Sequence, residues 1–358
     1  MVFPPETLLL FVQRIFEAMG CPPADAALAA DVLVSADLRG VDSHGVARLP
    51  GYVRLHELGR LNSTPTLRIL HETPSTAVLD GDAGLGLVVA PKAMAIAIEK
   101  AQTAGTGWVA VQNSNHFGIA GYHALLAVEK GCIGWAMTHA GPLVTPTFSK
   151  ERLLGTNPVC IGIPAGEEPP FLADFATTTA AYGKLENLQR KGQPAPTGWV
   201  QDAQGNPSTD SNVVRHGGAL LPLGGDREHG SHKGYGLGAA VDILSGVLSG
   251  ANYGPWVPPF ATAGFMSASE GVGRGTGHFL GAMRVDAFRP AAEFGLHMDQ
   301  WIRRFRAAEA VDGQRVLIPG DPERESEARL RREGIPLLEA VVVELEVIGK
   351  KFNLSLSS

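Results

Sequence analysis

The chain has 358 residues, of which 44% are hydrophobic and 18% charged, and its formal net charge is −6 at pH 7. This composition is typical of a folded protein, and the acidic balance argues against a nucleic-acid-binding surface, which normally carries a basic excess. Glycine is over-represented, with 44 of 358 positions, or roughly 12% against an average of about 7%. A chain of this length usually forms about two domains. Its many glycines predict tight turns or close backbone approaches.

Cysteine usage and the N-terminal sequence predict a reducing, cytoplasmic setting. Cys21, Cys132 and Cys160 are widely spaced and form no Cys-x-x-Cys pair, so neither a disulfide framework nor a zinc site is indicated. The apolar run at 8–12 is too short for a signal peptide, and no stretch reaches the ~20 apolar residues of a membrane span. We therefore expect a cytoplasmic protein with no metal, membrane or nucleic-acid partner.

The first part of the chain alternates helical and strand patterns. Apolar residues at helical spacing predict helices over 7–19 and 24–38. Further along, strands are expected at 76–79, 108–112 and 133–138, with helices at 88–104 and 122–130 between them. This alternation predicts an α/β or α+β fold.

The second half predicts strands at 159–163, 171–175 and 281–285, a turn-rich stretch of hairpins or an extended arm at 193–223, helices at 294–309 and 323–333, and a closing apolar element at 336–348. A helix expected at 233–249 carries a stripe of Gly234, Gly238, Gly246 and Gly250. Each glycine costs roughly 1 kcal/mol of helix propensity relative to alanine. Because such a stripe suits close packing against another backbone, we expect this helix to be buried.

The common nucleotide-binding fingerprints are incomplete. Gly84-Leu85-Gly86 follows a predicted strand and precedes a helix, as the Rossmann motif requires. However, Val89 and Ala90 occupy the region of the third glycine, and the next strand ends in Gln112-Asn113 instead of a ribose-binding acid. The Gly-Lys-Ser/Thr triplet of a P-loop does not occur. The sequence therefore argues against both motifs.

A polar segment at 42–48 combines groups suited to acid/base chemistry. It places the Ser43 hydroxyl beside His44, and Arg48 follows four residues later on the same face of a turn. An imidazole exchanges protons near neutral pH, and a guanidinium matches a carboxylate. Arg48 would hold the carboxylate of a 2-oxo or 2-hydroxy acid while His44 protonates the carbonyl oxygen. In the alternative interpretation, Ser43 is a helix N-cap and His44 a turn residue.

Other polar segments are individually ambiguous. The loop 113–118 follows a strand and contains His116, which suits a ligand site or a polar turn. Gly155-Thr156-Asn157-Pro158 indicates a tight turn with a polar pair. His229 and His232 have metal-pair spacing but no matching acidic third ligand. Lys233, at the start of a predicted helix, suits an anionic ligand.

Together these segments resemble the type 2 malate/L-lactate dehydrogenases, a group separate from the Rossmann-fold dehydrogenases that also includes ureidoglycolate, sulfolactate and diketogulonate enzymes and imino-acid reductases. The resemblance covers roughly residues 5–340. The matching segments, in the family's order, are 42–46 with Arg48, 115–118, 155–158, 174–177, 230–236 and 319–323.

The resemblance implies a non-Rossmann nicotinamide-binding fold with a largely antiparallel central sheet and a helical second domain. We expect a helical, substrate-binding domain over 1–120, completed by 300–358, and a cofactor-binding sheet domain over 121–299. The cofactor would be NAD or NADP, the substrate a small 2-oxo or 2-hydroxy acid, and the assembly a homodimer.

The resemblance also implies residue roles. His44 would be the proton donor and acceptor and Ser43 its relay partner, while His116 is an alternative acid/base. Substrate contacts would come from Arg48 and Thr156, and from Tyr182 at a position where relatives vary with substrate. The implied cofactor contacts are His116, Phe117, Gly118, Ile119, Ala120, Asp174, Phe175, Ala176, His232, Lys233, Pro319, Gly320 and Asp321. The expected reaction is hydride transfer to C2 of a 2-oxo acid; the alternatives are cyclic imino-acid reduction and an inactive nucleotide-binding relative.

Overall fold

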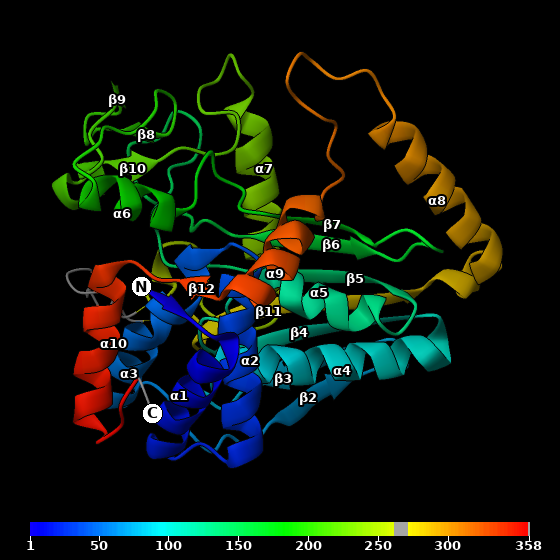
Figure 1. The fold of residues 1–358 in the computed structure, drawn as a ribbon, viewed down its shortest axis with the longest axis horizontal. Coiled ribbons are helices and arrows are strands. Elements are labelled where there is room, and N and C mark those ends of the chain that lie inside the picture. Colours follow the sequence, from blue (N-terminus) through cyan, green and yellow to red (C-terminus); the bar gives the residue numbers. More distant parts are fainter. Residues whose placement is uncertain (261–270, 357–358) are drawn as a thin grey trace.

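The computed structural model describes residues 1–260 and 271–356 and is organised around a seven-stranded sheet (Figure 1). Its strand order is β2-β3-β4-β11-β5-β6-β7. The strands are β2 (Arg68–Glu72), β3 (Thr76–Asp80), β4 (Thr106–Ser114), β5 (Cys132–Thr138), β6 (Val159–Ile163), β7 (Phe171–Phe175) and β11 (Thr276–Arg284). Only the β3–β4 pair among these neighbours is parallel, which confirms the largely antiparallel sheet and the mixed α/β class.

Two helices cover one face of this sheet. Helix α4 (Gly86–Ala104) connects the parallel strands β3 and β4, and α5 (Ala120–Val128) packs over β5 and β6 (Figure 1). The helices approach closely because glycines face them: a Cβ on Gly107 would lie 2.0 Å from the carbonyl oxygen of Ala97, and one on Gly134 2.2 Å from that of Ala124. Part of the glycine excess therefore lets helix and sheet backbones touch.

A second apolar core lies among helices at one end of the sheet. It is formed by α1 (Pro5–Ala18), α2 (Pro23–Leu38), α3 (Leu49–Glu57) and α10 (Glu339–Lys351), from both ends of the chain. Strands β1 (Val2–Phe3) and β12 (Ile335–Pro336) pair there, next to α9 (Asp321–Glu333) (Figure 1). The C-terminal segment thus packs against the N-terminal helices.

The turn-rich stretch forms a small layer of short paired strands, which confirms the predicted hairpins rather than an extended arm. Its three short strands, β8 (Val200–Gln201), β9 (Pro207–Ser208) and β10 (Ala219–Leu220), pair in the order β10-β8-β9. Helix α6 (Tyr182–Arg190), which the sequence pattern did not predict, packs with this layer around an apolar cluster that includes Leu185 and Val200.

The glycine-striped helix is only half buried. Helix α7 (Ser231–Asp242) continues into a π-helix (Ile243–Val247), and a Cβ on Gly234 would lie 2.3 Å from the Leu223 carbonyl oxygen. The expectation of a buried helix was right for this side and wrong for the opposite one, where Tyr235, Leu237 and Val247 are exposed. Close packing along one stripe does not require the other faces to be covered.

Two boundaries differ from those expected. Strand β11 begins at Thr276, five residues before the predicted 281. Its first part contains Gly277, and glycine is rarely a strand signal, so the sequence pattern did not mark this part as a strand. The Ser245 backbone packs closely against Gly277. The central sheet also crosses the expected domain boundary at 120, since β2, β3 and β4 precede it.

Within the described ranges, no helix has the length and apolar character needed to cross a membrane.

Candidate active site

A cavity of about 1070 Å³ lies where the helical region, the β7 side of the sheet and the small layer meet. Most of its walls come from four stretches of chain, at 39–48, 116–120, 140–158 and 172–184, and further lining residues lie at 223, 255–260 and 323. The predicted site residues that it brings together are Ser43, His44, Arg48, His116, Gly118, Ile119, Ala120, Thr156, Asp174, Phe175, Ala176 and Tyr182. Residues far apart in sequence thus form one site.

Other predicted residues lie outside this cavity. The Phe117 ring is fully buried in the core, where it stacks on His278. His232 and Lys233 are exposed at the start of α7 and do not line the cavity. The segment Pro319-Gly320-Asp321 also lies outside the lining, with the Pro319 carbonyl accepting the Leu172 N–H.

His44 ends a short 3-10 turn (Asp42–His44), and its ring faces a second imidazole. Its Nδ1 lies 2.9 Å from the Ser43 hydroxyl oxygen, and its ring stacks on His116 with a centroid distance of 5.6 Å. Desolvation, aided by the charge of Arg48, lowers the pKa of His44 to about 4. The imidazole is therefore neutral at pH 7 and can accept a proton.

The contacts of His116 orient its ring. Its Nδ1 accepts the Gly118 N–H at 3.3 Å and lies 2.6 Å from the Tyr52 hydroxyl. Because an Nδ1 that accepts a backbone N–H is unprotonated, the neutral ring carries its proton on Nε2. Desolvation and the nearby His44 lower the pKa of His116 well below its usual value. Phe260, with its ring centroid at 4.6 Å, packs against the same imidazole.

Arg48 is already engaged by protein groups. Its Nε donates to the Ser43 carbonyl at 2.5 Å, and its Nη2 pairs with Glu186 of α6 at 2.9 Å. Both side chains of the ion pair are largely buried. A substrate carboxylate would therefore use the remaining Nη1 or displace Glu186, a residue that the sequence analysis missed.

Asp37, a buried residue of α2, is hydrogen-bonded to the segment that follows His44. Its carboxyl is buried and accepts the Val46 N–H at 2.8 Å. Desolvation raises the pKa of Asp37 to about 8, although the Val46 hydrogen bond opposes the shift. At neutral pH this side chain is therefore protonated and uncharged.

The Asp37→Asn variant should lose a pH dependence of stability. An unfolded aspartate has a pKa of about 3.9, so the raised folded-state pKa contributes stability that is complete below pH about 4 and is lost as pH rises to about 8. Over this window the wild-type free energy of unfolding should fall by up to ~1.4 kcal/mol per pH unit relative to the variant. Thermal melts of both proteins between pH 5 and 8 measure this difference; parallel curves would contradict the assignment.

Buried polar groups hold the loop that carries His116. The Asn115 side-chain amide donates to the carbonyls of Ala83 and Gly84, at 2.9 and 3.0 Å. Next to this loop, His278 lies with Nδ1 at 2.8 Å from the Thr138 hydroxyl and Nε2 at 2.8 Å from the Ser114 hydroxyl. These contacts join β4, β5 and β11, so the sheet fixes the position of the loop.

The part of the cavity beside α5, β7 and α9 carries groups that suit a dinucleotide. Asp174 faces the open space and accepts the Gly121 N–H of α5 at 2.7 Å, while desolvation by the walls raises its pKa to about 6. Glu323 also lines the cavity, and its buried Oε2 has no hydrogen-bond partner among the described residues. Carboxylates of this kind can accept hydrogen bonds from ribose hydroxyls, and Ile119 and Leu172 supply apolar surface for flat rings. The residues present therefore suit the nicotinamide cofactor that the resemblance implies.

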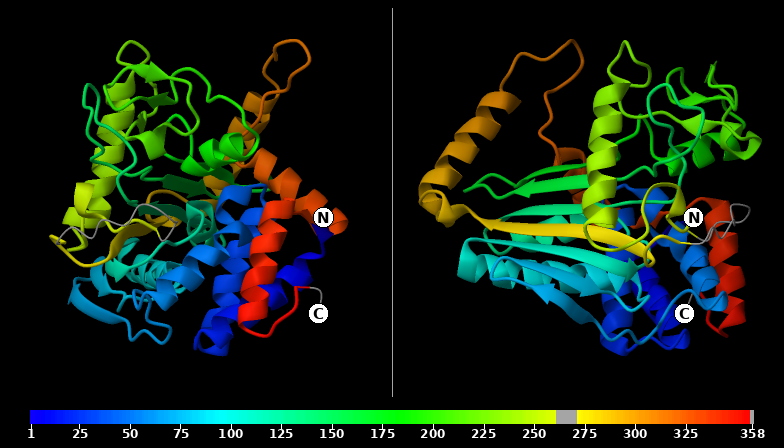
Figure 2. Two further views of the ribbon diagram at one scale, coloured as in Figure 1. Left: turned by 90° about the vertical axis from the view of Figure 1, so that its left-hand side faces the viewer. Right: turned by 180° about the vertical axis from the view of Figure 1, so that it is seen from behind.

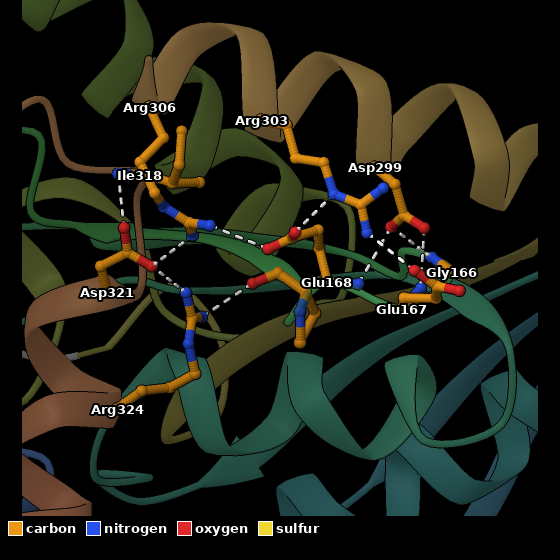
Figure 3. Close-up of polar contacts among 10 residues, drawn as sticks. Gly166, Glu167, Glu168, Asp299, Arg303, Arg306, Ile318, Asp321 and Arg324 are labelled. Carbon is orange, nitrogen blue, oxygen red and sulfur yellow. Dashed lines mark hydrogen bonds and ion pairs between the residues drawn. The ribbon is translucent and has the colours of Figure 1, made fainter.

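An ionic network explains the placement of Asp321 (Figure 3). Its carboxylate accepts the Ile318 N–H and pairs with Arg306 of α8 (Ala291–Arg306) and Arg324 of α9. Asp299 of α8 accepts the backbone N–H groups of Gly166, Glu167 and Glu168. Asp321 thus joins α8 to the start of α9, which carries Glu323, and Arg324 also donates to the Pro170 carbonyl just before β7.

Comparisons with known proteins agree with this architecture. Relatives that match nearly the whole chain include a malate dehydrogenase from Pyrococcus horikoshii, 44% identical over 351 residues (97% of this chain, 94% of the relative). An L-sulfolactate dehydrogenase from Methanocaldococcus jannaschii is 36% identical over 356 residues, covering 99% of this chain and 98% of the relative.

Solved structures show the same fold. The Pyrococcus horikoshii malate dehydrogenase superposes with a TM-score of 0.90 at 40% identity, covering 99% of this chain and 96% of that one. A delta1-piperideine-2-carboxylate reductase from Pseudomonas syringae gives a TM-score of 0.82 at 26% identity, covering 97% and 99%. The malate/L-lactate dehydrogenase family model matches residues 3–346. This chain therefore belongs to the malate/L-lactate dehydrogenase family.

Proposed function

We propose that this protein catalyses the reversible reduction of a small 2-oxo acid to the 2-hydroxy acid at C2, with NAD or NADP as cofactor. The observation that carries the proposal is the shared cavity of Ser43, His44, Arg48 and His116, with two facing imidazoles beside a guanidinium. Family membership supports a dehydrogenase acting on a hydroxy acid.

Each of these side chains has a distinct task in the proposed reaction. Arg48 binds the substrate carboxylate and so orients C2 and its oxygen. His44 gives a proton to that oxygen during reduction and takes it back during oxidation, with Ser43 at Nδ1 holding the ring. The Nε2–H of His116 provides a second hydrogen-bond donor. Thr156 and Tyr182 line the same cavity and complete the substrate contacts.

The cofactor, when bound, supplies or accepts the hydride. We propose that Asp174, Phe175 and Ala176, together with 118–120, hold it along the cavity wall. Direct cofactor contacts by Phe117, by His232 and Lys233, and by the 319–321 segment stay predictions, because these residues do not line the cavity.

A substrate panel tests the proposal. Oxaloacetate, pyruvate and a cyclic imino acid would each be offered with NADH and with NADPH while the nicotinamide absorbance is followed. Oxidation of either cofactor by a 2-oxo acid is the expected result. Failure of every 2-oxo acid would exclude the proposed activity. If the cyclic imino acid also failed, the inactive nucleotide-binding relative would be the better description.

Reduction of a cyclic imino acid is the second candidate, because the piperideine-2-carboxylate reductase shares the fold. A substrate nitrogen that arrives protonated depends less on a protein acid than a carbonyl oxygen does. In the same panel, turnover of the imino acid alone would favour this activity over the first.

We also propose a cytoplasmic homodimer. The three cysteines are free and buried, which suits a reducing compartment. Helix α8 extends away from the sheet (Figure 2) with Leu296, Trp301 and Phe305 exposed, and α7 exposes Leu237. Exposed apolar side chains on these two helices suit a second copy of the chain. Light scattering should give twice the chain mass of 37.7 kDa; a monomer at micromolar concentration would contradict the assembly.

A further inference from the structure

Arg48, which would hold the substrate carboxylate, is paired with a carboxylate of the protein itself. Its Nη2 lies 2.9 Å from an oxygen of Glu186 in α6, and the two side chains are only 15% and 18% exposed. Neither side chain makes another ion pair with the described residues. The positive charge of the guanidinium is therefore balanced within the protein.

The hydrogen-bond donors of Arg48 are only partly used. Nε donates to the Ser43 carbonyl at 2.5 Å, and Nη2 donates to Glu186. Since a guanidinium has five N–H donors, others remain for a ligand. Arg48 lines the large cavity, whereas Glu186 does not. A substrate carboxylate in the cavity can thus reach Arg48, but it must share the guanidinium with Glu186 or displace it.

The packing of α6 keeps Glu186 at Arg48. A Cβ on Gly183 would lie 2.5 Å from the Cβ of Ser43 and 3.1 Å from Nη2 of Arg48, so the helix backbone lies directly against these residues. Glu186 follows three positions later, on the same helix face, and Leu185 is fully buried in the apolar cluster of the small layer. The contact is therefore part of the packing of α6 and does not depend on a free surface side chain.

A second carboxylate at this guanidinium would be repelled by the first. Like charges a few ångströms apart interact unfavourably, and burial leaves little water or salt to screen them. An exposed ion pair would have little influence, but both side chains of this pair are largely buried. Sharing Arg48 and displacing Glu186 therefore both cost free energy that an unpaired arginine would not require.

We infer that Glu186 weakens the hold of Arg48 on the substrate carboxylate and thereby sets the KM for the acid. This inference rests on the proposed function, in which Arg48 binds the carboxylate next to C2. The 2-oxo acid and the 2-hydroxy acid carry the same carboxylate, so Glu186 affects the binding of both equally and leaves the hydride step unchanged. A looser hold lets either acid leave the cavity.

Glu186→Gln is the variant that tests this role, because its amide oxygen can still accept from Arg48 but carries no charge. The KM of the 2-oxo acid in reduction and the KM of the 2-hydroxy acid in oxidation should both fall about tenfold. The kcat should not rise, as expected when substrate and transition state are bound more tightly by the same amount. Damage to the site would weaken binding, so a lower KM distinguishes this role from a structural one.

Glu72→Gln is the matched control. Glu72 in β2 pairs with Lys100 at 2.8 Å, β2 lies at the opposite edge of the sheet from β7, and neither residue lines the cavity. This variant loses the same charge and an ion pair of similar length. Both of its KM values should stay within about twofold of the wild type, since distant sites act independently.

Thermal melts measure the same effect without turnover. The probes are oxamate, a carboxylate-bearing isostere of pyruvate, and oxamide, in which an amide replaces the carboxylate; each would be added to the wild type and to Glu186→Gln with NADH and with NADPH. Oxamate should raise the Tm of the variant more than that of the wild type. Oxamide should not distinguish the two proteins.

Glu186→Asp replaces Glu186→Gln if the latter does not fold. Its carboxylate is one methylene shorter and so lies further from Nη2, and both KM values should fall about two- to threefold. An unchanged or raised KM, a fall that Glu72→Gln reproduces, or equal oxamate shifts in variant and wild type would overturn the inference. Failure of the proposed function is a separate result, in which the wild type reduces no 2-oxo acid.

Discussion

Replacing His44 by alanine should lower kcat for 2-oxo acid reduction by about 10²- to 10⁴-fold, the usual contribution of a positioned general acid. The reason is that the imidazole lies in the cavity beside His116, and the Ser43 hydroxyl at its Nδ1 holds the ring. Cofactor affinity should change little, because the proposed cofactor contacts lie elsewhere. Steady-state absorbance at the nicotinamide band gives kcat, and fluorescence titration gives cofactor affinity.

The pH profile and a remote variant make this test specific. The pKa of His44 is lowered to about 4, so the protonated fraction grows as pH falls, and kcat/KM for reduction should rise about tenfold per pH unit from pH 7 towards pH 5. Oxidation, which needs the neutral ring, should be nearly constant there. His71→Ala, at an exposed position in β2, should behave like the wild type. Full activity in His44→Ala would transfer the acid/base role to His116.

The Gly86→Ala variant should be destabilised by about 3 kcal/mol or more, as for severe overpacking, and should lose activity as well. Gly86 begins α4, and a Cβ there would lie 2.1 Å from the Asn115 carbonyl oxygen and 2.5 Å from that of His116. Either the helix or the His116 loop must therefore move. Thermal unfolding measures the loss of stability, and kcat/KM measures displacement of the loop.

Gly131→Ala is the matched control. A Cβ on Gly131 would meet no atom within 4 Å, but its φ of 71° disfavours alanine, so it should cost only about 1 kcal/mol. Activity at low temperature should then equal that of the wild type. If Gly86→Ala melted like this control and kept its activity, the close approach of α4 to the His116 loop would not be a constraint.

Local sequence patterns predict most individual elements, but they do not predict how the strands are ordered in the sheet. Strands 159–163 and 171–175 were predicted with the bounds that the structure shows, because short apolar runs between turns are local signals. The antiparallel sheet order was expected only from the family resemblance. Strand β11 pairs with both β4 and β5, more than 130 residues away, and no local pattern encodes such a pairing.

The same distinction applies to the site. The segment with Ser43, His44 and Arg48 was found because its groups are neighbours in sequence. Glu186 and Tyr52 were missed, because each acts through a contact that only the fold creates, with Arg48 and His116 respectively. A lone acid on a polar helix is usually a solvated surface residue, so no signal in the sequence marked Glu186.

The most direct test of the account is to follow the hydride itself. The protein would be incubated with a 2-oxo acid that it reduces and with nicotinamide cofactor carrying deuterium at the transferable C4 position, and the hydroxy acid would be analysed by mass spectrometry and NMR. We predict one deuterium per product molecule, located at C2. Product without deuterium at C2, or cofactor oxidation without formation of a 2-hydroxy acid, would contradict the proposed reaction.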